Sequence, residues 1–161
     1  METLARLIVD IPRLAQGGEH LVGDLPPETL DYGENDAGIA PVSPLHYDLQ
    51  VQVLGDELLV RGSASQTIQA LCSRCGTPFQ ITAKEPDFLQ SFQIVAGNEL
   101  LDLTPALREG IILALPTYPV CADSCKGLCV HCGANLNKGT CSCGDGVTPD
   151  SHWAALDKLT L

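Results

Sequence analysis

Eight cysteines are the residues of this chain whose type and spacing can do chemistry. They form four close pairs, two of them within Cys-x-x-Cys turns, and six of the eight fall within residues 121–143. Thiolates are soft ligands, and four of them suit tetrahedral Zn²⁺. Eight sulfur atoms are enough for two closed four-cysteine sites. The candidate metal ligands are Cys72, Cys75, Cys121, Cys125, Cys129, Cys132, Cys141 and Cys143.

A glycine follows each Cys-x-x-Cys pair. Gly76 follows Cys75, and Gly133 follows Cys132. Glycine allows the chain to turn sharply after the second ligand, so that backbone N–H groups point at sulfur. The repeated pattern predicts two zinc knuckles.

The spacing does not decide which pairs share a metal ion, because four pairs can be grouped into two sites in three ways. We favour Cys72, Cys75, Cys121 and Cys125 as one site and the remaining four cysteines as the other. The second site would then close locally across residues 133–137, whereas the first would join the middle of the chain to its C-terminal part. His131 lies inside the second knuckle and could replace a cysteine, and an iron–sulfur cluster is an alternative to zinc.

The beginning of the chain bears on the state of these thiols. Residues 1–14 carry Glu2, Arg6, Asp10 and Arg13 and lack the continuous apolar core of a signal peptide. No apolar run approaches the roughly 20 residues that span a bilayer. We therefore expect a cytoplasmic protein, in which thiols stay reduced and disulfides are disfavoured.

The chain is strongly acidic, with 9 Lys and Arg against 20 Asp and Glu and a net charge of −11. Two Zn²⁺ ions bound by eight thiolates would change the net charge to about −15. This charge argues against broad nucleic-acid binding, which needs a basic face. It favours a basic protein as partner, or a small local basic patch on RNA.

A β-sheet is predicted for the middle of the chain. Residues 45–53 alternate between apolar and polar side chains, which indicates a half-buried strand, and Gly55-Asp56 supplies a hairpin turn. Further strands are expected at 57–63, 65–72, 77–83 and 88–96, with the Cys72 knuckle as one of the turns. Residues 3–9 read as a first strand, and 13–40 as turns and loop.

One main helix is predicted after the sheet. Thr104 is a suitable N-cap, Pro105 fits the first helical position, and Pro116 stops the helix at about Leu115. The stiff segment 116–119 then delivers Cys121 to a defined place. Residues 152–159 read as a short amphipathic helix that docks on its own core or binds a partner.

Together these patterns predict an α+β fold. It is an antiparallel β-meander packed with one main helix, plus a C-terminal Cys-rich module that resembles a zinc ribbon. The expected division is an α+β domain at 1–116, a zinc-binding module at 117–145 and a tail helix at 146–161.

The order of these motifs resembles a known family. A Cys-x-Arg-Cys pair at 72–75 is followed by the helical segment 102–121, the cluster CKGLCVHCGANLN with Cys141 and Cys143, and the tail HWAALDKL. The chain is similar in this respect to the YceD-like family, the large ribosomal RNA subunit accumulation proteins. Relatives often have proline after the first cysteine of the second knuckle, where this chain has Val130.

The resemblance implies a small bacterial cytoplasmic protein, not an enzyme, that is needed for normal accumulation of large-subunit ribosomal RNA. Plant organelles contain relatives with a similar role. Some relatives lack the second half of the cluster but keep ligand-type residues at the places of Cys121 and Cys125, which supports the favoured grouping. The expected partner is a ribosomal precursor, contacted through a basic ribosomal protein or through RNA near Arg74 and Lys84. The alternative reading of Arg74 is an ion pair with the thiolate site.

Two enzymatic alternatives compete with this reading. A thiol-disulfide oxidoreductase usually places Cys-x-x-Cys at a helix N-terminus, and neither pair here opens a convincing helix. A zinc hydrolase keeps a ligand position open for water, which four thiolates do not leave. The remaining histidines, His20, His46 and His152, have no sequence neighbour that suggests acid–base catalysis.

Overall fold

The computed structural model describes residues 5–14, 18–29, 38–95, 97 and 99–143. It contains a five-stranded antiparallel sheet, a separate two-stranded sheet and one α-helix. The strands are β1 (Ile8–Asp10), β2 (Glu19–Leu25), β3 (Ala40–Pro41), β4 (Leu45–Leu54), β5 (Glu57–Leu71), β6 (Pro78–Gln93) and β7 (Leu100–Asp102). The helix α1 spans Thr104–Leu113, and short 3₁₀ turns lie at Ile11–Arg13 and Pro27–Thr29.

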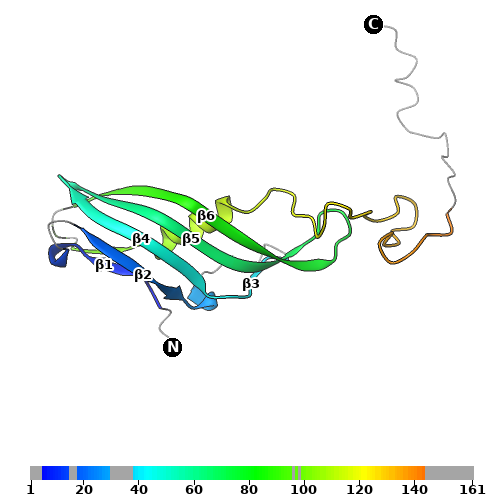
Figure 1. Ribbon diagram of the computed structural model, residues 1–161, viewed down its shortest axis with the longest axis horizontal. Coiled ribbons are helices and arrows are strands. Elements are labelled where there is room, and N and C mark those ends of the chain that lie inside the picture. Colours follow the sequence, from blue (N-terminus) through cyan, green and yellow to red (C-terminus); the bar gives the residue numbers. More distant parts are fainter. Residues whose placement is uncertain (1–4, 15–17, 30–37, 96, 98, 144–161) are drawn as a thin grey trace, which may run out of the picture.

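The predicted α+β fold is confirmed: β4, β5 and β6 form an antiparallel meander (Figure 1). The alternation in β4 buries Leu45, Leu49 and Val51 completely. Leu54 pairs with Glu57 around the predicted turn, where Gly55 has a φ of 66° that favours glycine. The sheet therefore follows directly from the period-two pattern.

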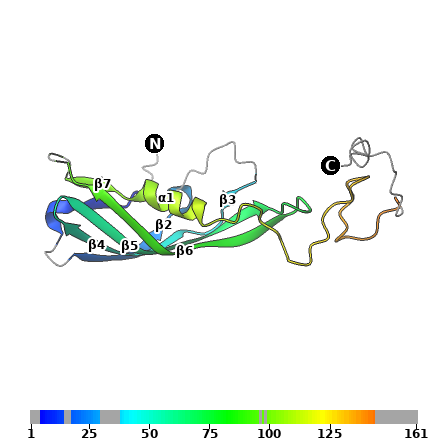
Figure 2. The ribbon, with the colours of Figure 1, turned by 90° about the horizontal axis from the view of Figure 1, so that it is seen from above.

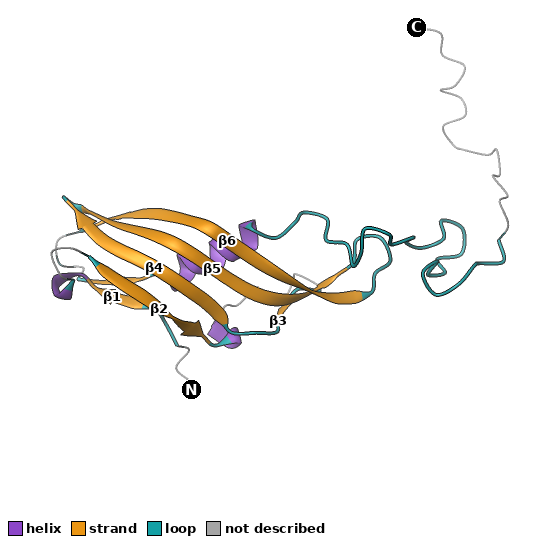
Figure 3. Ribbon diagram, in the orientation of Figure 1, coloured by secondary structure: helices purple, strands orange, loops and turns teal. Residues whose placement is uncertain are grey.

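The predicted strand breaks within β5 and β6 are wrong. The segments expected as four short strands form two long ones, β5 of 15 residues and β6 of 16 residues, drawn as continuous arrows in Figure 3. The interruption is a register shift between Gly62 and Ala64. A β-bulge absorbs the irregular residues without ending a strand, because pairing resumes on both sides. Only glycine fits at position 62, since a Cβ there would lie 2.0 Å from the carbonyl oxygen of Asp48.

The N-terminal third contains more sheet than the sequence predicted. β2 lies within the segment read as loop and pairs along its whole length with β4. Its alternation is weak because Gly23 stands in the middle of it, where a side chain would collide with Tyr47. The expected first strand is short: β1 begins at Ile8 and pairs with β7. β3 pairs with β5 at Gln69 and Ile68, beyond the end of β4.

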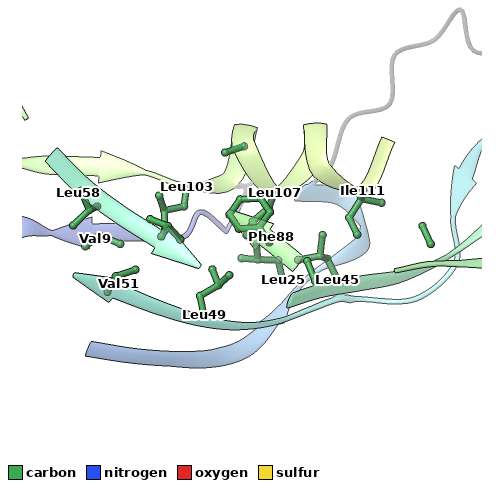
Figure 4. Packing of buried hydrophobic residues seen from close by; sticks show 14 of the residues in the cluster. Val9, Leu25, Leu45, Leu49, Val51, Leu58, Phe88, Leu103, Leu107 and Ile111 are labelled. Carbon is green, nitrogen blue, oxygen red and sulfur yellow. The ribbon is translucent and has the colours of Figure 1, made fainter. Parts of the chain in front are cut away.

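The helix covers one face of the main sheet (Figure 2). Leu103, Leu107 and Ile111 are fully buried against side chains of the strands, including Phe88 of β6 (Figure 4). Each such side chain contributes roughly 1.5–3 kcal/mol by leaving water. Thr104 is the first helical residue and not the N-cap; its hydroxyl accepts a hydrogen bond from the Leu7 N–H (2.9 Å). The helix thus ties the N-terminal segment to the sheet.

The described residues after α1 form irregular chain. Most of this chain lies beyond the end of the sheet, next to the β5–β6 turn (Figure 1). Within 117–143 the only β pairing is an isolated bridge between Leu128 and Asn135. The predicted tail helix at 152–159 lies outside the described residues. Among the described residues, no helix has the length and apolar character that crossing a membrane would require.

Candidate metal centres

The first Cys-x-x-Cys pair forms the turn that connects β5 to β6. The Cys72 N–H donates to the Thr77 carbonyl (3.0 Å), and the Gly76 N–H donates to the Cys72 carbonyl (2.8 Å). Gly76 has a φ of 66°, which is the left-handed conformation that glycine adopts at no cost. Two long paired strands hold this turn, so its two sulfur atoms are fixed by the sheet.

The second pair repeats this turn without a sheet beneath it. The Cys129 N–H donates to the Ala134 carbonyl (2.8 Å), the Gly133 N–H donates to the Cys129 carbonyl (2.9 Å), and Gly133 has a φ of 71°. The two knuckles therefore share their hydrogen bonds residue for residue. This is the local geometry that the glycine after each pair predicted.

The structure brings the eight sulfur atoms into the two groups that we favoured from the sequence. In the first group, the Sγ atoms of Cys72, Cys75, Cys121 and Cys125 all lie within 4.8 Å of one another. In the second, the Sγ atoms of Cys129, Cys132, Cys141 and Cys143 do the same. His131 is exposed and belongs to neither group.

Backbone hydrogen bonds hold the segment that contains Cys121 and Cys125 against the first knuckle. The Ser73 N–H donates to the Pro119 carbonyl (2.8 Å), and the Leu128 N–H donates to the Arg74 carbonyl (3.1 Å). Ser73 and Arg74 are the two residues between the ligands of the first knuckle. The turn therefore captures the returning chain on both sides of the second ligand pair.

Arg74 makes a contact that was not considered from the sequence. Its Nη1 donates to the carbonyl oxygens of Asp123 (3.0 Å) and Cys125 (3.2 Å). A guanidinium presents several donors in a rigid fork, so one side chain can hold two carbonyls of the same loop. Arg74 thus fastens the Cys121–Cys125 segment to the first knuckle.

The sulfur geometry fits a tetrahedral metal ion. Zinc–sulfur bonds of about 2.3 Å place neighbouring sulfur atoms roughly 3.8 Å apart. The Sγ atoms of Cys72 and Cys125 are 3.9 Å apart, and those of Cys75 and Cys121 are 3.8 Å apart. In the second group Cys129 and Cys141 are 3.4 Å apart, which is far longer than a disulfide. Both groups can therefore hold a metal ion with four sulfur ligands.

The two groups differ in burial. In the first group Cys72, Cys75 and Cys125 are 3%, 6% and 8% exposed and pack with Phe79 and Val120. In the second group only Cys129, at 9%, is comparably buried, whereas Cys132 and Cys143 are exposed. Three of the four ligands in the first group are therefore buried, with Cys121 exposed, whereas the second group lies mostly at the surface.

Hydrogen bonds to sulfur set the thiol pKa values in opposite directions within each group. The Cys121 N–H, which donates to Cys72 Sγ (3.4 Å), is the main cause that lowers the pKa of Cys72 to about 6. Backbone N–H groups of Cys132 and His131 lower the pKa of Cys129 to about 6.

Hydrogen bonds between the thiols of a group act in the other direction, because a thiol that donates to a neighbouring sulfur loses its own proton less readily. Side-chain hydrogen bonds with Cys125 and Cys132 raise the pKa of Cys121 and Cys143, respectively, to about 12. Each group is therefore prepared to carry negative charge on one sulfur before a cation arrives.

Three polar side chains around the first group were not recognised from the sequence. The Thr77 hydroxyl lies 3.3 Å from Cys75 Sγ, and its hydrogen bond lowers the pKa of that thiol. The Asn137 Nδ2 donates to Cys125 Sγ (3.3 Å), and the Asn135 Nδ2 donates to Thr77 Oγ1 (3.2 Å). The Asn-x-Asn spacing between two ligand pairs is a signal that could have suggested this role.

Two histidine–carboxylate pairs were also not expected. His20 Nε2 lies 2.6 Å from Asp48 Oδ1, and His46 Nδ1 lies 3.1 Å from Asp24 Oδ1, across strands β2 and β4. All four side chains are exposed on the sheet by about half or more. Such exposed cross-strand pairs support sheet pairing by a few tenths of a kcal/mol to about 1 kcal/mol.

The fold and the site define a class: a small α+β protein whose sheet ends in a knuckle, with two four-cysteine groups at that end. Residues 84–160 match the family described as "Large ribosomal RNA subunit accumulation protein YceD". Over these residues the chain is similar to the YceD-like family.

Individual relatives match over different lengths. An uncharacterized protein of Mycobacterium leprae is 26% identical over 92% of this chain and 67% of its own length. An uncharacterized protein of Mycobacterium tuberculosis is 30% identical over 71% of this chain and 61% of its own. A chloroplastic "Large ribosomal RNA subunit accumulation protein YCED homolog 1" of Arabidopsis thaliana is 41% identical over 27% of this chain and 14% of its own. No solved structure matches the chain.

Proposed function

We propose that this protein is a non-enzymatic zinc-binding factor that supports accumulation of large-subunit ribosomal RNA and ribosome assembly in the bacterial cytoplasm. The observation that carries the proposal is the pair of closed four-sulfur groups in a chain that is similar to the YceD-like family. Under this proposal residues 117–145 act as the metal module of the 1–116 body, and all eight cysteines bind metal.

The closed geometry supports a structural metal and not a catalytic one. A catalytic zinc keeps one position for water or substrate, whereas four thiolates occupy every position of a tetrahedron. The choice of zinc over iron follows from the knuckle geometry with its glycine. The redox alternative has less support, because the one α-helix among the described residues contains no cysteine to serve as a reactive helix N-terminal thiol.

The distribution of charge supports contact with the ribosomal precursor through the cysteine-bearing end. The knuckle-side part of β5 and β6 (65–84) and residues 114–143 together hold four Lys or Arg residues and one acidic residue, Asp123, a net of +3 in a chain of −11. Two filled sites would add about −4 and leave this part near −1, while the remainder stays near −14. RNA would therefore approach the cysteine-bearing end, whereas a basic ribosomal protein would favour the acidic remainder.

Elemental analysis of the purified protein tests the metal assignment. We expect two zinc ions per chain; iron, or no metal, would overturn it. Depletion of the protein, followed by quantification of precursor and mature large-subunit RNA, tests the role itself. We expect mature RNA to fall and to recover when the intact chain is supplied. Unchanged RNA levels would defeat the ribosomal proposal.

Crosslinking of the intact protein within growing cells separates the two kinds of partner. A crosslinker introduced at Lys126 or Lys138 should capture large-subunit RNA if RNA lies against the cysteine-bearing end. The matched position is Glu57, at the opposite end of β5 within the acidic part. Capture of a basic ribosomal protein from Glu57, with no RNA from the other two positions, would favour the protein partner.

A further inference from the structure

A loop that belongs to the second cysteine group makes hydrogen bonds to the first. Residues 133–140 connect Cys132 to Cys141, so both ends of the loop are ligand positions of the second group. The middle of the loop turns back towards the β5–β6 knuckle. Its two asparagines provide donors at the first group, although neither group shares a cysteine with the other.

Asn137 is the most direct of these contacts. Its Nδ2 donates to Cys125 Sγ (3.3 Å), and its Oδ1 accepts from the Lys126 N–H (2.8 Å). One side chain therefore holds both the sulfur atom of a ligand and the backbone that follows it. A hydrogen bond to a thiolate stabilises its charge and fixes the orientation of the ligand.

Asn135 holds Asn137 in place and reaches a second ligand indirectly. Its Oδ1 accepts from the N–H (3.0 Å) and the Nδ2 (2.9 Å) of Asn137. Its own Nδ2 donates to Thr77 Oγ1, which in turn contacts Cys75 Sγ. The two asparagines thus act on one ligand from each cysteine pair of the first group.

This arrangement of the asparagines requires both ends of the loop, Cys132 and Cys141, to be held in place. Between them it is held by the Leu136 N–H, which donates to the Gly127 carbonyl (3.0 Å), and by the bridge of Asn135 with Leu128. Most of the loop is exposed, so few packing contacts offset the conformational entropy of ordering it. Joining Cys132 and Cys141 through a common ion removes much of that entropy in advance.

We propose that metal bound by the second cysteine group strengthens retention of metal by the first, and that Asn137 is the positioning residue through which this coupling acts. The inference rests on the proposed metal-binding role. Linkage makes the coupling reciprocal, so metal in the first group also favours binding in the second. Metal bound in the exposed group thereby slows the loss of metal from the buried group.

The first test is the variant Asn137→Asp in the full chain loaded with zinc. Aspartate keeps an oxygen for the Lys126 N–H but removes the donor to Cys125 Sγ. We expect zinc to leave the first group for a chromophoric chelator about 10-fold faster, the size typical for loss of an outer hydrogen-bond partner of a metal ligand. Asn137→Ala should behave similarly. The matched control is Lys138→Ala, because this neighbouring side chain makes no hydrogen bond or ion pair among the described residues.

The second test opens the loop with the double substitution Cys132→Ser and Cys141→Ser. We expect one zinc ion to remain and to leave about 10-fold faster than the slow zinc of the wild-type chain. Adding Asn137→Asp to this background should change the rate little further, because the loop no longer holds the side chain in place. Circular dichroism of the sheet confirms that each variant is folded.

Two results would overturn the coupling. One is release from the first group at the wild-type rate in the opened-loop variant; the other is an equal acceleration by Asn137→Asp in both backgrounds. These results differ from failure of the proposed function, which would appear as a wild-type chain that binds no zinc at all.

Discussion

The two cysteine groups use the same turn in different surroundings. In the first, the knuckle connects two strands of 15 and 16 residues, and its partner ligands return from a segment 46 residues or more away. In the second, all four ligands lie within residues 129–143 and most are accessible to solvent. The comparison indicates that the same Cys-x-x-Cys-Gly knuckle can belong to a centre that holds the fold together or to one that orders only a loop. We expect ligand substitutions, whose effect on stability depends on burial, to affect the two groups unequally. We expect changes in thiol protonation to affect metal binding by the two groups equally.

Acidification should have the largest effect on metal content. At equilibrium, both groups should lose metal over the same pH range. The pKa of Cys72 and of Cys129 is lowered to about 6, so the thiolate contribution is present above the ordinary thiol pKa and is lost as pH falls through about 6. The raised pKa of Cys121 and Cys143 acts in the opposite sense, and its contribution is lost only as pH rises through about 12. We expect zinc to leave both groups between pH 7 and pH 5, measured by metal content after buffer exchange. A chain that keeps both ions at pH 5 would contradict this.

Cys72→Ser should have the next largest effect. It removes a 3% exposed ligand from the centre that joins the sheet to residues 117–128. We expect bound zinc to fall from two ions to one and the unfolding temperature to fall by more than about 10 °C, since metal binding free energy is folding free energy. Calorimetry and elemental analysis measure the two quantities. A redox enzyme would instead stay equally stable and lose only thiol reactivity.

Cys132→Ser is the matched change in the second group, where the ligand is exposed. We expect loss of one zinc ion with a fall in unfolding temperature of no more than about 3 °C, because β4, β5 and β6 do not depend on this group. Hydrogen exchange should increase in residues 128–141 and stay unchanged in the strands. Equal destabilisation by Cys132→Ser and Cys72→Ser would remove the distinction between the two groups.

Arg74→Ala should have the smallest effect of the series. It removes two hydrogen bonds to carbonyls of the Cys121–Cys125 segment from an exposed side chain, a loss of about 1 kcal/mol in the free energy of unfolding. Zinc should leave the first group somewhat faster, with a smaller increase in release from the second through the reciprocal coupling. Arg74→Lys should restore little, because a lysine lacks the guanidinium fork. Full recovery by lysine would indicate that charge alone matters at this position.

The sequence predicted the strongly periodic elements of the fold. The alternation of 45–53 indicated β4, and Pro105 and Pro116 indicated approximately where α1 begins and ends. It did not predict that β5 and β6 are continuous. The breaks expected between 57–63 and 65–72 and between 77–83 and 88–96 are absent, because nothing local shows that a neighbouring strand restores pairing beyond a bulge. β2 was missed for a related reason: its pairing with β4 compensates for a weak pattern of its own.

The eight candidate ligands and the turn at each knuckle were determined by the sequence alone, since ligand type, spacing and the following glycine are local properties. What surrounds the ligands was decided by the tertiary structure. Contacts between segments far apart in the chain place Arg74 on the carbonyls of Asp123 and Cys125, and bring Asn137 to Cys125 Sγ. They also bury most of one cysteine group and leave most of the other accessible to solvent. Local geometry follows from the conformational preferences of a few residues, whereas burial and long-range hydrogen bonds depend on which segments the folded sheet brings together.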